Sequence, residues 1–326
     1  TLSIVASVYC EGGHLHEFVA SLAGVLAPLK AETGLCYEIV LVDDGSTDES
    51  LEKLRILSSE LGEKNPEFVA KLKIIEQQNS GVSTTRNRGV TMAKYNYIAF
   101  LDADDWWEPT FLEEMKALIE GHSEAGIYGS SYFKVRNGKF IIPNIGVDKE
   151  FTKGYIDYFE VYAKTMWMPL WTGAIVIPKA IYKEFNGFKS ELKMGEDFHL
   201  WVRIADKYKV AFLNRQLSNY NQDVDVTNRA VDEKLYLPHE HMLFADYSFI
   251  QNKTGFTRLF EVLAVYGLMP YYLANRNKAE VRKILNSIHW ENHAFKYRLY
   301  YRFLPRLTVK WWYKALKFGT KIKKYI

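Results

Sequence analysis

Residues 97–107 read YIAFLDADDWW and residues 37–46 read YEIVLVDDGS, so the apolar runs Tyr97–Leu101 and Tyr37–Val42 each end in a cluster of aspartates. Two further short apolar runs are Ser3–Tyr9 (SIVASVY) and Leu72–Glu76 (LKIIE). Short β-branched runs bounded by turn residues are typical of the buried strands of a parallel sheet. The sequence therefore predicts four such strands in the first third of the chain.

Segments with helical periodicity separate these strands. His14–Lys30 and Val82–Lys94 are predicted helices, and Ser46 with Glu49 predicts a capping box ahead of a third helix. The order βαβαβαβ predicts an α/β protein with an open sheet, in which ligands bind at the carboxyl ends of the strands.

The pattern is mixed after Pro109 and helical near the end. We expect a hairpin at 125–142, a strand at 173–177, helices at 178–185 and 196–208, and mostly helix from Val231, broken at Gly255, Pro270 and Pro305. A boundary near residues 225–232 then separates a domain of residues 1–228 from a helical region of residues 229–326.

Composition excludes several classes of protein. The chain has 326 residues, of which 48% are hydrophobic and 25% charged, as expected for a folded globular protein. Two cysteines give neither a disulfide framework nor a zinc site. The uncharged stretch Val262–Ala274 is shorter than the roughly 18 to 20 residues that cross a bilayer. The sequence therefore excludes a membrane-spanning protein and disfavours a secreted one.

The two aspartate clusters are expected to meet at one edge of the sheet. Asp102 and Asp104 form a D-x-D, which could offer one carboxylate to Mg²⁺ or Mn²⁺ bound with a diphosphate and leave the other for a sugar hydroxyl. Asp44 could accept the imide N–H of uracil or the hydroxyls of a ribose. The alternatives are solvated acidic turns for the first cluster and a helix cap for Asp44.

Three charged residues on predicted helices could complete this site. Arg86 could pair with phosphate, although helical arginines are often surface residues. In the pair Glu196–Asp197, one carboxylate could take a proton from an acceptor hydroxyl while its neighbour orients it. The alternative is that both acids only favour the helix N-terminus electrostatically.

Five ordered blocks resemble glycosyltransferase family 2, the inverting enzymes of GT-A fold. The blocks are SIVASVY, VDDGSTDES, NSGVSTTRNRG, FLDADDWWEP and the segment from Trp171 to Arg203, which ends in GEDFHLWVR. The resemblance spans roughly residues 1–225. It implies a Rossmann-like open mixed sheet flanked by helices, with a nucleotide-binding part at about 1–108 and an acceptor part at about 109–228.

The resemblance also implies a role for each candidate residue. The residues that would bind the nucleotide are Ser7, Tyr9, Glu11, Asp44, Arg86 and Asp102. Of these, Tyr9 and Asp44 would contact the uracil and Asp102 the ribose. Asp104 would hold Mn²⁺ or Mg²⁺. Asp197 would be the catalytic base, with Glu196 beside it.

Two positions depart from the family pattern. Cys10 stands where the family usually has asparagine, close to the predicted base-binding loop. Many members also carry a histidine after the Glu-Asp helix, whereas residues 220–225 here read YNQDVD. Either Asp223 substitutes for that histidine or the metal has fewer protein ligands.

We therefore expect an inverting, metal-dependent glycosyltransferase that moves a sugar from a nucleotide diphosphate sugar, a UDP-sugar, to a glycan or lipid-linked acceptor. The resemblance implies bacterial surface polysaccharide synthesis. The alternatives are a metal-dependent nucleotidyltransferase and a catalytically silent module that binds nucleotide sugars.

The end of the chain lies outside the resemblance. Residues 296–326 contain seven Lys and three Arg but no Asp or Glu, and since the whole chain is at +3, residues 1–295 are at −7. Cations interleaved with aromatics suit an anionic membrane surface, and the acidic remainder disfavours nucleic acid. We expect a cytoplasmic protein, peripheral on the inner face of the cell membrane; the alternative is a solvated helical face that covers the catalytic domain.

Overall fold

The computed structural model describes residues 1–33, 36–223 and 235–313. Their order is that of an α/β protein followed by helices. The strands are β1 Leu2–Val8, β2 Tyr37–Asp43, β3 Leu72–Glu76, β4 Tyr97–Phe100, β5 Trp106–Trp107, β6 Ala125–Arg136, β7 Lys139–Ile141, β8 Lys153–Ile156, β9 Ile175–Pro178 and β10 Lys209–Asn221. The helices are α1 Leu15–Thr33, α2 Ser50–Lys64, α3 Pro66–Val69, α4 Val82–Met92, α5 Phe111–Gly121, α6 Tyr158–Thr165, α7 Lys179–Glu184, α8 Glu196–Lys207, α9 Lys253–Gly267, α10 Met269–Ala274, α11 Lys278–Ser287 and α12 Phe295–Arg298.

One mixed sheet has the strand order β3-β2-β1-β4-β9-β6-β10-β5, with β7 on β6 and β8 on β10. β3, β2, β1 and β4 are parallel, as predicted, and β9 is antiparallel to both β4 and β6. β10 pairs in parallel with β6, and their register shifts at three places. The expected open mixed sheet flanked by helices is confirmed.

Alternate residues of each strand pack on opposite faces of the sheet, because successive side chains of a strand point to opposite sides. Ile4 of β1 packs on the face that α1 and α5 cover, whereas Val5 packs with Val90 of α4 on the other. Gly89 allows this close packing, since a Cβ there would lie 2.3 Å from Val5 Cγ1. Parallel strands with both faces covered present their carboxyl ends at one open edge.

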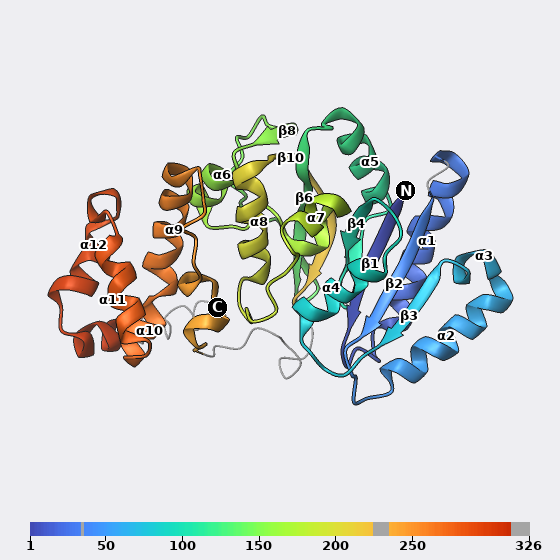
Figure 1. Ribbon diagram of the computed structural model, residues 1–326, viewed down its shortest axis with the longest axis horizontal. Coiled ribbons are helices and arrows are strands. Elements are labelled where there is room, and N and C mark those ends of the chain that lie inside the picture. The colour runs from blue at the N-terminus through green and yellow to red at the C-terminus, as the bar shows by residue number, and fades with distance from the viewer. Residues whose placement is uncertain (34–35, 224–234, 314–326) are drawn as a thin grey trace.

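The predicted helical C-terminal region is confirmed in residues 235–313. Helices α9 to α12 lie at one end of the molecule, at the left in Figure 1, with α6 and α8 between them and the sheet. Gly255 lies within α9, so the predicted break there is wrong. Leu268 separates α9 from α10 just ahead of Pro270, and Pro305 directly precedes the last described helix, so these two predicted breaks are confirmed. The predicted boundary between residues 228 and 229 falls in 224–234, outside the described residues.

In the part of the chain that the structure describes, no helix combines the length and the apolar character that crossing a membrane requires.

Candidate functional site

Arg86 connects the two predicted halves of the site. Its Nη2 donates to both carboxylate oxygens of Asp102, at 2.8 and 2.7 Å, and its Nη1 lies 3.4 Å from Glu196 Oε1. Burial alone would lower the pKa of Arg86, but Asp102 and then Glu196 raise it. The guanidinium therefore brings the loop after β4 and the start of α8, 94 positions apart in the chain, to one place.

Ser7, at the end of β1, also reaches this place. Its hydroxyl donates to Asp102 Oδ1 at 3.0 Å, so Asp102 is held from two sides. β1 and β4 are parallel neighbours, which aligns Ser7 with the loop that follows β4. Three of the predicted site residues thus form one hydrogen-bonded group with Glu196.

The Glu196–Asp197 pair lies in the first turn of α8. Burial, followed by the neighbouring Asp197, raises the pKa of Glu196 to about 7, and burial likewise raises the pKa of Asp197. The Asp197 carboxylate accepts the backbone N–H of Phe198 at 2.6 Å. A carboxyl group whose pKa lies near neutral pH is suited to taking a proton from a substrate hydroxyl.

Tyrosines surround Asp197, a feature that sequence reasoning missed. Together with burial, Asp197 raises the pKa of four tyrosines, namely Tyr132, Tyr158, Tyr162 and Tyr247. Tyr158 and Tyr162 occupy one face of α6, and their four-residue spacing is the signal that could have indicated them. Buried aromatic side chains consequently lie on the side of Asp197 toward α6.

Glu11 faces the D-x-D loop. The pKa of Glu11 is raised to about 8, first by burial and then by repulsion from the carboxylates of Asp104, Asp102 and Asp48. Such mutual repulsion marks an excess of negative charge that a hard divalent cation would relieve, since oxygen ligands are what Mg²⁺ and Mn²⁺ prefer. Asp104 belongs to this group. Among the described residues no three or more acidic, His or Cys side chains are arranged to hold a metal by themselves, so substrate oxygens or water would have to complete the shell.

Asp44 is buried and binds the loop that follows β3. Its carboxylate accepts from Gln77 Nε2 at 2.7 Å and from the backbone N–H groups of Ser80 and Gly81, both at 2.9 Å. It does not cap α2, which begins at Ser50, so that alternative is wrong. Beside it a cleft of about 630 Å³ is lined by Gly45, Glu76, Gln77, Gln78 and Asn79, at the carboxyl ends of β2 and β3.

The predicted capping box is also wrong. The Ser46 hydroxyl donates to Asp43 and accepts the backbone N–H of Cys10 at 3.0 Å, while Asp48 accepts the N–H of Ser50, the first residue of α2. Ser46 instead joins the loop after β1 to the loop after β2. Tyr9 lies beside this junction with 44% of its surface exposed, and Cys10 has a left-handed φ of 55°.

Asp223 and Asp105 both fasten the backbone. Asp223 accepts from the backbone N–H groups of Asn137 and Gly138 at the predicted turn between β6 and β7. Buried Asp105 accepts the N–H of Asn221 at 2.8 Å. Since the Asp223 carboxylate binds this turn, the structure gives no support to its substituting for the missing histidine.

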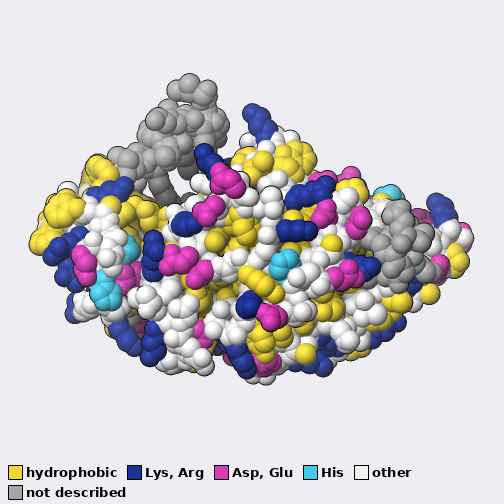
Figure 2. Space-filling view, turned by 90° about the horizontal axis from the view of Figure 1, so that it is seen from above, with side chains coloured by type: hydrophobic (Ala, Val, Ile, Leu, Met, Phe, Trp, Pro, Cys, Tyr) yellow, Lys and Arg dark blue, Asp and Glu magenta, His cyan; other side chains and the backbone are white. Residues whose placement is uncertain are grey.

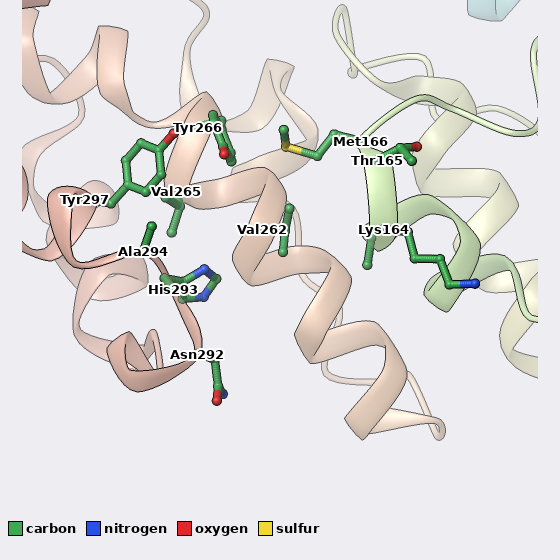
Figure 3. Close-up of a pocket in the computed structure, with 11 residues that line it drawn as sticks. Lys164, Thr165, Met166, Val262, Val265, Tyr266, Asn292, His293, Ala294 and Tyr297 are labelled. Atoms are coloured by element: carbon green, nitrogen blue, oxygen red, sulfur yellow. The ribbon is translucent and has the colours of Figure 1, made fainter. Parts of the chain in front are cut away.

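A second cavity, of about 210 Å³, lies away from these residues (Figure 3). The end of α6, including Lys164 and Met166, forms one side; α9 and the segment around His293 form the others. None of the predicted site residues lines it. The cleft beside Asp44, rather than this cavity, adjoins the predicted site.

Comparison with known proteins gives a consistent result. The family model described as Glycosyl transferase family 2 matches residues 3–181. Glycosyltransferase GlyA of Streptococcus pneumoniae is 28% identical over 240 residues, which cover 72% of this chain and 32% of GlyA. Hyaluronan synthase of Pasteurella multocida is 22% identical over 232 residues, covering 69% of this chain and 21% of the synthase. The chain spans about a third of the length of the first of these relatives.

Solved structures of S. aureus TarS share the fold. TarS residues 1–349 in complex with UDP-GlcNAc superpose with a TM-score of 0.58 at 18% identity, covering 89% of this chain and 73% of that one. A further crystal structure of TarS residues 1–349 gives a TM-score of 0.56. At this identity the likeness concerns the architecture, which is the one expected from the sequence.

Proposed function

The chain belongs to glycosyl transferase family 2, and on that premise we propose that it transfers a sugar from a UDP-sugar to a hydroxyl of a glycan or lipid-linked acceptor, with inversion at C1. The observation that carries the proposal is the Arg86 bridge between Asp102 and Glu196. It puts a carboxylate suited to a ribose and a carboxyl pair suited to base catalysis in one site. Relatives such as hyaluronan synthase support a role in surface polysaccharide synthesis.

The donor nucleotide would lie at the carboxyl ends of β1 to β4. The cleft beside Asp44 would take the base, with exposed Tyr9 stacking at its rim and Asp44 accepting an imide proton. Asp102, Ser7 and Arg86 would then meet the ribose or the phosphates. The UDP-GlcNAc in the similarly folded TarS supports a uridine donor for this chain.

Asp104 would hold Mn²⁺ or Mg²⁺ near Glu11 and Asp102. When bound, the cation neutralises the charge that develops on the diphosphate leaving group. The raised pKa of Glu11 supports a cation at this loop, because added positive charge would let all these carboxylates ionise together.

Asp197 would take the proton from the acceptor hydroxyl as that oxygen attacks C1. Glu196, held by Arg86, would keep the first turn of α8 in place. Burial raises the pKa values of both groups toward the range in which a general base works at neutral pH. We further propose a cytoplasmic location, peripheral on the inner face of the membrane, where a lipid-linked acceptor would be met.

A thermal-shift panel of UDP-, GDP-, dTDP- and CMP-sugars, with and without Mn²⁺, tests the donor. We expect stabilisation by UDP-sugars, larger with Mn²⁺, and loss of the Mn²⁺-dependent part in Asp104→Ala. Glu113→Ala, an exposed acid in the first turn of α5, is the matched control.

Identification of the released nucleotide then separates the candidate activities. A nucleoside diphosphate supports glycosyl transfer, whereas pyrophosphate would identify a nucleotidyltransferase. Binding with no turnover of any donor, over a panel of acceptors, would reduce the protein to a binding module.

A further inference from the structure

Large apolar side chains are exposed together near the end of the described chain. We define the C-terminal face as five of them with their exposed fractions: Phe295 68%, Phe303 61%, Leu307 71%, Trp311 79% and Trp312 49%. Their surface costs free energy in water unless something covers it. The face therefore has the character of an interaction surface.

The last described helix, residues 306–313, presents two distinct sides. Val309 is buried in the cluster that contains Trp290 and Tyr301, which holds the helix on α9 to α11. Leu307 and Trp311, one turn apart, are exposed on another side. Packing within the chain thus accounts for the inner side and leaves the outer side to a partner.

Within residues 296–313 every Lys and Arg is exposed and no residue is acidic. The described part of residues 296–326 contributes exposed Lys296, Arg298, Arg302, Arg306 and Lys310, and the sequence has no acid in that range. Figure 2 shows Lys and Arg beside hydrophobic side chains at the left end of the molecule, where Figure 1 has the C-terminal helices. The acidic character of residues 1–295 makes this segregation of charge sharper.

We propose that the C-terminal face binds the surface of an anionic phospholipid membrane. Tryptophan and phenylalanine insert among headgroups and upper acyl chains, while lysine and arginine attract the phosphate groups. Exposed aromatic side chains combined with cations fit an anionic membrane as the partner better than they fit a neutral protein surface. The inference deepens the proposed function and rests on it in one respect: a lipid-linked acceptor would be presented at that surface.

Vesicle sedimentation of the full chain without donor tests the proposal. We expect pelleting with vesicles of phosphatidylcholine and phosphatidylglycerol in equal parts, much less with phosphatidylcholine alone, and release by high salt. Leu307→Ser with Trp311→Ser should lower the partition coefficient about tenfold or more, because two apolar anchors are lost. Ile56→Ser with Met92→Ser, two exposed apolar residues on α2 and α4 (49% and 48%), is the control and should pellet normally.

The charges are tested separately. Lys296→Gln with Lys310→Gln should lower the partition coefficient about 25-fold, since each cation near an anionic surface contributes about fivefold. Lys53→Gln with Lys64→Gln on α2 is the matched control. Thermal melts check that each variant folds, and UDP-sugar binding, measured on the same variants, should stay at the normal level. Membrane attachment and donor use can therefore fail independently.

Several results would overturn the proposal. Equal pelleting of the Leu307/Trp311 variant and its control would do so, as would equal pelleting on neutral and anionic vesicles. A dimer in light scattering that the Leu307/Trp311 variant abolishes, with no vesicle binding, would assign the face to a second copy of the chain. Binding to an oligonucleotide in place of vesicles would assign it to nucleic acid.

Discussion

Arg86 on α4 donates to both carboxylate oxygens of Asp102 through one nitrogen, Nη2, at 2.8 and 2.7 Å, while its Nη1 faces Glu196. Both the guanidinium and its partners are largely buried. A single side chain thus pairs with a carboxylate of the loop after β4 and with one of α8, so any change in one carboxylate alters the charge felt by the other.

Arg86→Lys should therefore weaken both stability and donor binding. A lysine cannot span two carboxylates with a planar fork. Leaving buried charges without their partner costs about 3–5 kcal/mol, and Lys should recover part of that cost. Denaturant unfolding and UDP-sugar titration measure the two effects. Arg88 lies two residues further along the same helix and is exposed, so Arg88→Lys should change neither stability nor donor binding. Equal effects of the two substitutions would contradict the role of Arg86 as a bridge between Asp102 and Glu196.

Asp197→Asn should leave donor affinity within about twofold and lower the transfer rate by about 10²- to 10⁴-fold, the usual contribution of a general base. Glu196→Gln should instead weaken donor binding as well, because it removes a charge partner of Arg86. Donor titration together with steady-state transfer separates the two. If Glu196→Gln abolishes turnover without weakening donor binding, while Asp197→Asn keeps turnover, Glu196 would be the base instead.

Glu11 should make the protein less stable as pH rises. Its pKa in the folded protein, about 8, exceeds the ordinary 4.5, so the folded state holds the proton more tightly between these values and stability falls as pH increases through that window. Denaturant unfolding at a series of pH values should show a shallower slope in Glu11→Gln than in the unaltered protein. Glu17→Gln, exposed on α1, is the control. Addition of Mn²⁺ should stabilise the protein more at pH 8 than at pH 5, and a variant slope equal to the original would refute the assignment.

Cys10→Asn should raise stability by about 0.5–1 kcal/mol. A left-handed backbone costs most L-residues about 1–2 kcal/mol, and asparagine tolerates it better because its side chain bonds locally. Four of the five other non-glycine residues with positive φ in the described chain are asparagines. Cys10→Val should destabilise, because a β-branched residue fits this conformation poorly. Denaturant unfolding gives both values, and Cys36→Ser controls for loss of a thiol; a destabilising Cys10→Asn would be the contrary outcome.

Local pattern predicted β1, β2, β3 and β4 to within one residue at each end, and α4 to within two. These elements could be predicted because periodicity and turn residues within a dozen positions decide them. Parallel order then implied that Asp44 and Asp102 leave the sheet at one edge, which the structure confirms. The hairpin between β6 and β7 could also be predicted, because Asn and Gly favour the positive φ that its turn requires. Asn137 and Gly138 both have it.

Elements that form only because of partners far away in the sequence could not be predicted. β10 carries Asn, Arg and Gln among its apolar residues, and it is a strand because β6, β5 and β8 pair with it. The predicted capping box failed for a related reason: Ser46 binds the backbone of Cys10, 36 positions away.

The order of residues along the chain thus determined the four parallel strands, the edge at which their carboxyl ends lie and the types of side chain at that edge. Which carboxylate faces which, that Arg86 serves two of them, and that tyrosines enclose Asp197 were decided by tertiary packing alone. The reason is physical: backbone preferences act over one or two turns, whereas a charge or a hydroxyl in a buried site takes whichever partner folding brings within about 3 Å.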